Sequence, residues 1–343
     1  MKQLITFSVL LGLLMLVSCT KDNEFNPLNP IQDYSVTEVD LRNGNCPDQN
    51  PNIAFGKEVS LHGGDFFTGG WGAGLTVGAE TIVDGIFFEK QTQWDLGPVW
   101  WDSNDGDQRW VEINLGGLYR ITSLIVQADD NDAYKLLYWM NPASGSWETL
   151  WNVPNYDVSP DPYSWGMQTR PNPYDDTERY CLYDPVMTTH LRFEGDMDDS
   201  DRLFAVSEIQ AFGVCIVPVD IKPGSCPNPI NTKSNGVLPV AVLGMPSLDV
   251  SNIDPASVRL HGVAPLRWAV EDVGAPYRPF VGKEDAYDCH EYEGDGIPDL
   301  TLKFNKQEIV ETLGDVEKGD VLIIPLTGAM QDGILFEGED VMV

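Results

Sequence analysis

The sequence predicts an all-β fold, a β-sandwich followed by a second, mainly β domain, and two observations lead to this prediction. Its 343 residues include 32 glycines and 24 prolines, a composition that favours many turns and short strands over long helices. In residues 109–116, apolar side chains recur at every second position from Val111 to Leu115, with Glu112 and Asn114 between them. This alternation is typical of a half-buried antiparallel strand. The length leaves room for about two domains.

The charge balance excludes one large class of partners. Fifty-three acidic residues against 21 basic ones give a formal net charge of -32. Such a surface repels nucleic acid phosphates and anionic lipid head groups, so we expect no nucleic acid partner. Where carboxylates converge they would attract divalent cations, and calcium prefers oxygen ligands of this kind. We expect most of the carboxylates to be solvated.

Residues 1–18 have the features of a signal peptide. Lys2 precedes an apolar run over residues 4–16, which is shorter than the roughly 20 residues that a membrane-spanning helix needs. The run ends in Leu-Val-Ser-Cys at residues 16–19, which resembles a bacterial lipobox. The resemblance implies that Cys19 is lipidated, becomes the new N-terminus and anchors the protein in a membrane. An ordinary secretory signal with an incidental cysteine is the alternative.

The residues after Cys19 indicate where the anchored protein faces. Residues 20–24, Thr-Lys-Asp-Asn-Glu, resemble the tag that sends some Gram-negative lipoproteins to the cell surface. The resemblance implies a location in the bacterial outer membrane, with the protein facing the cell exterior. Residues 19–45 are rich in Asn, Pro and Asp, and we interpret them as a tether.

The first domain is predicted over residues 46–215. Its expected strands are residues 52–57, 109–116, 121–128, 134–140, 147–150, 191–193 and 207–213. The strands at 109–116 and 207–213 are both predicted to end at a glycine. In this order the segments resemble the discoidin domain, the galactose-binding-like family of coagulation factor V/VIII type C domains. The resemblance implies a jelly-roll sandwich whose loops bind sugars or lipid head groups.

Sugar recognition needs a flat aromatic face and a few fixed polar groups, and loops carry binding more often than strands. The aromatic candidates on predicted loops are Trp71, Trp100 and Trp165, and the candidate hydrogen-bond donors are His62, Arg109 and Arg170. A plain surface role is the alternative for each donor. Trp101, Trp110 and Trp147 are expected in the core. Residues 86–99 form an insertion relative to the family, which weakens a residue-by-residue transfer of the ligand loop.

The discoidin resemblance also implies a structural calcium ion. In the sugar-binding members its ligands come from an Asp-Gly step and from a glutamate of the last strand, which correspond here to Asp84 and Glu208. The alternative is that Asp84 initiates a turn and Glu208 is a surface residue. The acidic runs at 129–132 and 196–201 are expected to be solvated loops, with a further calcium site as the alternative.

The cysteine count indicates an oxidising compartment, since five cysteines remain once Cys19 is assigned to lipid. Discoidin domains often join their two ends by a disulfide, and this resemblance implies a bond between Cys46 and Cys215. Cys226 and Cys289 would then pair within the second domain and leave Cys181 free.

The second domain is predicted over residues 216–343. Residues 217–228, 236–244 and 299–304 resemble a module of secreted, multidomain prokaryotic proteins, for which the resemblance implies no activity. Alternating apolar residues from Leu300 to Phe304 predict a strand. A short helix follows, capped by Asn305 with Glu308 three residues later, and Gly314 ends it.

A second candidate calcium site lies just before that strand. Residues 291–302 place acidic side chains and a glycine as in an EF-hand loop, but Leu302 stands where the loop needs a bidentate acid. A looser site would use Asp295 and Asp299. A tight turn before the strand is the alternative.

The sequence favours a binding protein over an enzyme. Its four histidines show no metal-ligand spacing, and it contains no nucleophile elbow or phosphate-binding loop. We therefore predict a non-catalytic, surface-anchored lipoprotein that binds a glycan or glycoconjugate through loops of the first domain. The alternatives are an adhesive protein that binds other surface proteins and, third, a glycoside-processing enzyme.

Overall fold

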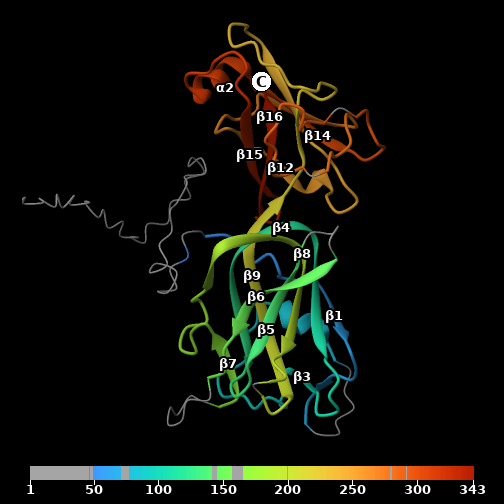
Figure 1. Ribbon diagram of the computed structural model, residues 1–343, viewed down its shortest axis with the longest axis vertical. Helices are drawn as coiled ribbons and strands as arrows, with labels where there is room; N and C mark the ends of the chain where they lie inside the picture. Colours follow the sequence, from blue (N-terminus) through green and yellow to red (C-terminus); the bar gives the residue numbers. More distant parts are fainter. Residues whose placement is uncertain are drawn as a thin grey trace, which may run out of the picture. The chain divides into compact units, whose positions relative to one another are not determined.

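The computed structural model describes residues 46, 49–70, 77–140, 145–156, 165–198, 200–278, 280–290 and 292–343. Strands dominate these residues, and the all-β prediction is confirmed (Figure 1). The one α-helix in this part of the chain is α2 (Lys306–Leu313). Within the same ranges, no helix has the length and the apolar character needed to cross a membrane.

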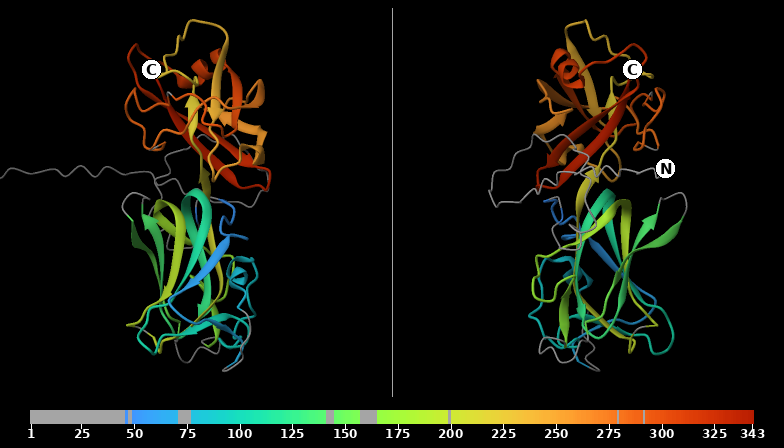
Figure 2. Two further views of the ribbon diagram at one scale, coloured as in Figure 1. Left: turned by 90° about the vertical axis from the view of Figure 1, so that its right-hand side faces the viewer. Right: turned by 60° about the vertical axis from the view of Figure 1, so that its left-hand side comes forward.

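A sandwich is built from the first nine strands, and β4 belongs to both of its layers (Figure 2). The strands are β1 (Glu58–His62), β2 (Phe67–Thr68), β3 (Val99–Asp102), β4 (Trp110–Asp129), β5 (Tyr134–Met140), β6 (Ser146–Val153), β7 (Met167–Arg170), β8 (Tyr180–Gly195) and β9 (Leu203–Ile216). The first part of β4 pairs with β1 and β8, and the second part pairs with β9, β7 and β8. Strands β5 and β6 extend the first layer, and β3 and β2 extend the second.

The prediction that two strands end at glycines is wrong in both cases. Strand β4 continues through Gly116, which has φ +76°, and its register with β8 shifts between Asn114 and Tyr119. Glycine adopts this conformation without strain, so the chain forms an irregularity and continues as a strand. Gly213 lies within β9, where a Cβ would come within 2.2 Å of the Arg120 carbonyl oxygen. Its missing side chain therefore allows β9 to approach β4.

The sandwich core follows the predicted alternation, because Val111, Ile113 and Leu115 are fully buried. Trp101 is also in the core, as expected, and packs against Phe204. The core prediction is wrong for the other two tryptophans. Trp110 is half-buried, because it lies on a sheet face between the ring of His62 and a guanidinium group, and Trp147 is half-buried on β6, where it packs edge-on against Trp139.

The remaining strands form two ladders. They are β10 (Val219–Ile221), β11 (Val237–Val242), β12 (Ile253–Leu260), β13 (Arg267–Glu271), β14 (Asp299–Asn305), β15 (Leu322–Met330) and β16 (Leu335–Met342). An antiparallel sheet has the order β10-β11-β14-β13. Strands β12, β15 and β16 form the other ladder, and β16 also pairs in parallel with the end of β9.

The helix α2 forms where the sequence predicted it. The Asn305 side chain accepts a hydrogen bond from the Gln307 amide at 3.1 Å, and Gly314 is the C-cap residue with φ +71°. Glu308 accepts a hydrogen bond from the Asn305 side chain at 2.7 Å, which orients the cap.

Two disulfides join Cys46 to Cys181 and Cys226 to Cys289. The second is the predicted bond, whereas the predicted pairing of Cys46 with Cys215 is wrong. The Arg179 side chain donates to the Asn50 carbonyl oxygen at 3.1 Å, which holds the segment near Cys46 against the start of β8 and its Cys181. Cys215 is buried at the end of β9, and burial raises the pKa of its thiol to about 12.

Candidate functional site

A hollow of about 340 Å³ lies at the end of the sandwich where β4 finishes and β7 begins. Its lining residues come from three loops and are Gln93, Trp94, Asp129, Asp130, Asn131, Trp165 and Gly166. We call it the tryptophan hollow, because the indole rings of Trp94 and Trp165 are its two large apolar surfaces.

Two of the three loops are fixed to each other by backbone contacts. The Met167 amide donates to the Thr92 carbonyl oxygen at 2.8 Å. Gly166 has φ +71°, and a Cβ at this position would lie only 2.5 Å from the same Thr92 oxygen. Only glycine allows this approach without a shift of the backbone, so Gly166 determines how the loops close around the hollow.

Arg170 fixes the third loop, which follows β4, through hydrogen bonds to backbone carbonyl oxygens. Its side chain is fully buried, and its guanidinium group donates to the carbonyl oxygens of Ala128 at 2.6 Å, Asp129 at 2.5 Å and Pro154 at 3.1 Å. These donors are used by the backbone, so the prediction that Arg170 hydrogen-bonds the ligand directly is wrong. The sequence identified an important arginine but not its role, which is to shape the loop at the end of β4.

The aromatic side of the hollow consists of Trp165 and Trp94. The Trp165 side chain is 53% exposed, and its role as a sugar platform stays a prediction. Trp94 is half-buried and packs edge-on against Trp100, with ring centroids 5.0 Å apart. Trp100 is only 1% exposed and its indole N–H donates to the Gly69 carbonyl oxygen, so the prediction that Trp100 contacts ligand is wrong. It supports Trp94 from the core.

The polar side of the hollow is rich in hydrogen-bond acceptors. Asp129 and Asp130 are buried, and burial, assisted by neighbouring carboxylates, raises the pKa of Asp129 to about 7 and that of Asp132 to about 8. One carboxyl oxygen of Asp129 and one of Asp132 have no hydrogen-bond partner among the described residues. Of these residues, Asp129 and Asp130 line the hollow, where their carboxyl groups can hydrogen-bond to ligand hydroxyls, whereas Asp132 lies outside the lining.

The prediction that the two acidic runs are solvated loops is wrong for the first run. Asp129, Asp130 and Asp132 are buried because Arg170 draws their backbone carbonyls inward. The second run packs against them, since the Asp201 amide donates to Asp132 at 3.3 Å.

The other predicted ligand donors do not reach the hollow. Arg109 is buried and forms a two-pronged ion pair with Asp105 at 2.9 and 2.6 Å, so its donors serve the loop before β4. His62 stacks on the Trp110 ring, with centroids 5.2 Å apart, and contacts the Ser60 hydroxyl. Trp71 lies outside the described residues, as does Cys19, the predicted lipidation site.

The structure brings together Asp84 and Glu208, the two residues that the resemblance implied for calcium. Both oxygens of Glu208 accept from the Gly85 amide, at 3.1 and 3.3 Å, and one also accepts from the Gln210 side chain. Burial raises the pKa of Glu208 to about 8, and the charge of Asp84 contributes in the same direction. Two close carboxyl groups offer oxygen atoms of the kind that calcium prefers, but they supply only part of its 6–8 ligands.

The second calcium candidate has a different environment. Asp299 is buried and accepts from the backbone amides of Gly244, Val273 and Gly274 at 2.8–3.1 Å. Asp295 accepts from the Ile297 amide within its own turn. These bonds favour the alternative of a tight turn before the strand.

Over the described ranges, no group of three or more His, Cys, Asp or Glu residues could hold a metal ion, so calcium at Asp84 and Glu208 would need further oxygen ligands.

The sequence did not predict that Gln93 and Trp94 line the hollow. Both lie in the insertion at residues 86–99, where the chain departs from the discoidin pattern, and no family position pointed to them. A tryptophan beside an amide in an inserted loop was the one available signal.

No protein-family model and no curated protein matches the chain. Solved structures similar to it include CpGH89CBM32-6 from Clostridium perfringens, with 13% identity, a TM-score of 0.29, and 48% of this chain and 99% of that chain covered. A fucose-binding module of Streptococcus pneumoniae has 12% identity and a TM-score of 0.30, with 48% of this chain and 96% of that one covered.

A third similar structure is chitosan-binding module 2, in complex with chitotriose, from a Paenibacillus chitosanase/glucanase. It has 16% identity and a TM-score of 0.29, and covers 47% of this chain and 100% of the module. At these identities and TM-scores the likeness carries no argument about ligands. The chain is thus similar to carbohydrate-binding modules over about half its length.

Proposed function

We propose that this protein is a surface-anchored lipoprotein that binds carbohydrate without catalysis, through the tryptophan hollow. The observation that carries the proposal is the exposed Trp165 ring beside the carboxyl groups of Asp129 and Asp130. An aromatic face packs against the apolar side of a sugar ring, while fixed polar groups bind its hydroxyls. The volume of about 340 Å³ falls at the lower end of the range for ligand pockets.

The charge of the hollow narrows the class of sugar. Asp129 and Asp130 are acceptors, and the -32 net charge of the chain adds a negative field around them. Sulfated, phosphorylated or uronic acid groups would be repelled. We therefore expect neutral sugars or amino sugars to bind, with hydroxyl or ammonium groups facing the carboxyls.

A glycan array followed by calorimetry tests the proposal. Trp165→Ala should reduce the affinity for the best glycan at least tenfold, because it removes the stacking face. Trp268→Ala is the matched control, since Trp268 is 48% exposed but lies on β13, outside the hollow. Equal affinity in wild type and Trp165→Ala would overturn the proposal.

The proposed anchor and location rest on the sequence of the first 24 residues. A lipid on Cys19 would hold the protein in the outer membrane, with residues 19–45 as a tether to the sandwich. Cys19→Ser should move the protein out of the membrane fraction. Protease added to intact cells should remove the wild-type sandwich if it faces outward.

We propose that calcium binds at Asp84 and Glu208 and supports the fold near the hollow without taking part in chemistry. Support for a calcium ion comes from the buried Glu208 carboxyl group. Among the described residues it hydrogen-bonds only to uncharged donors, the Gly85 amide and the Gln210 side chain. Bound calcium would neutralise the two carboxylates and tie the Asp-Gly turn to β9.

A second candidate function is adhesion to another surface protein. All five residues of β13 are exposed, and β13 pairs only with β14 among the described strands, so its other edge is open. Trp268 and Val270 add exposed apolar area to this edge. An open strand edge can accept a strand from a partner. Cell adhesion lost in Trp268→Lys but retained in Trp165→Ala would favour this function.

A further inference from the structure

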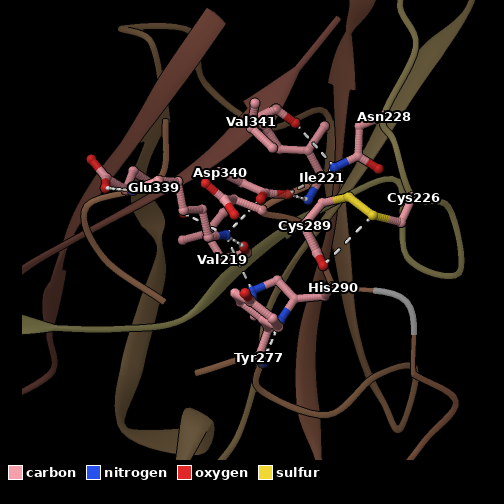
Figure 3. A network of polar contacts seen from close by, with 12 residues as sticks. Val219, Ile221, Cys226, Asn228, Tyr277, Cys289, His290, Glu339, Asp340 and Val341 are labelled. Atoms are coloured by element: carbon pink, nitrogen blue, oxygen red, sulfur yellow. Dashed lines mark hydrogen bonds and ion pairs between the residues drawn. A yellow bond between two sulfur atoms is a disulfide. The ribbon is translucent and has the colours of Figure 1, made fainter. Parts of the chain in front are cut away.

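A buried lysine and a buried aspartate meet among the C-terminal strands (Figure 3). The Lys283 ammonium nitrogen lies 2.6 Å from Oδ1 of Asp340, and both side chains are almost completely excluded from solvent. The same nitrogen contacts the backbone carbonyl oxygens of Val219 at 3.4 Å and Glu339 at 3.2 Å. The lysine nitrogen therefore faces the carboxyl group in a site that is almost fully excluded from solvent.

The carboxyl group of Asp340 is held in a fixed orientation. Its second oxygen accepts from the Ile221 amide at 2.6 Å and from the Asn228 side chain at 3.1 Å (Figure 3). Asn228 also donates to the Val341 carbonyl oxygen. The disulfide between Cys226 and Cys289 joins the segment that carries Asn228 to the segment that carries Lys283. The carboxyl group of Asp340 and the amino group of Lys283 are thus held in a fixed relative position.

A third ionisable group, Asp220, lies beside this pair. It is fully buried, and neither of its carboxyl oxygens has a hydrogen-bond partner among the described residues. Burial raises the pKa of Asp220 to about 8, the charge of Asp340 acts in the same direction, and the charge of Lys283 opposes them. Asp220 makes no hydrogen bond to the pair, so Asp340 is the carboxyl group that Lys283 faces.

His290 lies on the other side of the lysine. The Tyr277 amide donates to Nδ1 of His290 at 2.7 Å, so the ring proton is on Nε2, which lies 3.3 Å from the lysine nitrogen. Burial and the charge of Lys283 lower the pKa of His290 to about 3, so the ring is neutral. An Nε2–H group offers no lone pair to an ammonium, but it can donate to a neutral amine. His290 thus presents an N–H donor toward the lysine nitrogen.

We propose that Lys283 and Asp340 become joined by an intramolecular amide bond. Asp340 first takes a proton from the Lys283 ammonium, which leaves a neutral amine facing a neutral carboxylic acid. The amine nitrogen attacks Cγ of Asp340 and the Nζ–Cγ bond forms. A proton then passes from the nitrogen to the hydroxyl oxygen Oδ1, and the Cγ–Oδ1 bond breaks. One water molecule is released, and nothing is oxidised or reduced.

The fold supplies what this condensation needs. Groups held in reacting distance gain a large effective concentration, and exclusion of water opposes hydrolysis of the product. The bond would close a covalent loop from Lys283 to Asp340 and would fix β16, the last strand of the chain. Unlike an ion pair, it would persist when the protein is denatured.

Mass spectrometry of the purified full-length protein tests the proposal. After reduction and tryptic digestion, the peptide of residues 319–343, which contains Asp340, should be joined to the peptide that contains Lys283. The joined species should weigh one water less than the two peptides together, and trypsin should not cleave after Lys283. Recovery of the two peptides separately and unmodified from folded protein would overturn the proposal.

Two variants test the roles of the groups. Lys283→Arg retains the charge but should not form the amide, so its two peptides should be recovered separately with no loss of water. Asp340→Asn should form the same amide with loss of ammonia, so its product should have the same mass as the wild-type product. If a variant does not fold, the wild-type peptide map still decides whether the bond exists.

Discussion

The α-carbon of Gly166 lies so close to Thr92 that a Cβ would come within 2.5 Å of the Thr92 carbonyl oxygen. This approach fixes the two loops that carry Trp94 and Trp165. Gly166→Ala should therefore widen the hollow, lower the stability by about 1–3 kcal/mol and weaken glycan binding. Calorimetry and urea unfolding measure both effects. Gly106→Ala is the control for backbone strain alone, since Gly106 has φ +90° with no atom within 4 Å of its Cβ position. Equal losses in both variants would contradict the steric explanation.

Arg170 should be essential for the loop at the end of β4. Arg170→Met would leave several buried carbonyl oxygens without donors, and we expect a loss of about 3–5 kcal/mol in the free energy of unfolding. Urea unfolding measures this loss. Arg267→Met, at an exposed position of β13, should change stability by less than about 0.5 kcal/mol. A comparably small loss of stability in Arg170→Met would show that water replaces the guanidinium group as the hydrogen-bond donor to these carbonyl oxygens.

Calcium should raise the melting temperature of the wild-type protein, and EDTA should reverse the rise. Glu208→Gln should abolish the calcium effect, because the amide keeps the shape of the side chain but lacks its charge. Glu311→Gln, on the exposed side of α2, should leave the effect intact. Differential scanning calorimetry with and without calcium makes the comparison. A calcium response that survives in Glu208→Gln would place the ion elsewhere.

In EDTA, stability should fall as the pH rises from about 5 to 8. Burial raises the pKa of Asp129 to about 7 and those of Asp132, Glu208 and Asp220 to about 8, so the folded state holds these protons more tightly than the unfolded chain. Their stabilising contribution is complete below the unfolded pKa values and is lost as the pH passes the folded ones. Each group contributes at most about 1.4 kcal/mol per pH unit. Urea unfolding across this range measures the slope, and a rise in stability with pH would contradict the assignment.

The disulfide pattern can be tested by thiol labelling. Cys215→Ala should retain both disulfides, whereas Cys181→Ala should free the Cys46 thiol and cost about 2–5 kcal/mol. Maleimide labelling of the native and the denatured protein counts the free thiols. Labelling of Cys46 in Cys215→Ala would contradict the bond to Cys181.

Much of the fold could be predicted because it depends on local patterns. The alternation from Val111 to Leu115 identified a buried strand face, and Asn305 and Gly314 marked the two ends of α2. The length of β4 could not be predicted, because a glycine such as Gly116 occurs both in turns that end a strand and in irregularities within a strand. Only the pairing with β8 and β9 distinguishes the two.

The candidate site was harder to predict, since it depends on contacts between distant segments. Trp165 was identified because an exposed aromatic on a loop is informative by itself. The roles of Trp100 and Arg170 were misassigned, because the sequence does not reveal that Gly69 and the carbonyls after β4 occupy their donors. Asp220 carries no sequence signal at all, and its raised pKa arises mainly from burial, with a contribution from the charge of Asp340.

Strand β4 couples the unfolding of the two layers of the sandwich. Because β4 supplies backbone hydrogen bonds to β1 in one layer and to β9 in the other, neither layer can separate without disrupting the other. Amide protons of the two layers should therefore exchange with solvent through a shared global opening, as a single foldon. The sandwich would then expose no partly opened sheet to proteases, and its lifetime in their presence would follow the rate of complete unfolding.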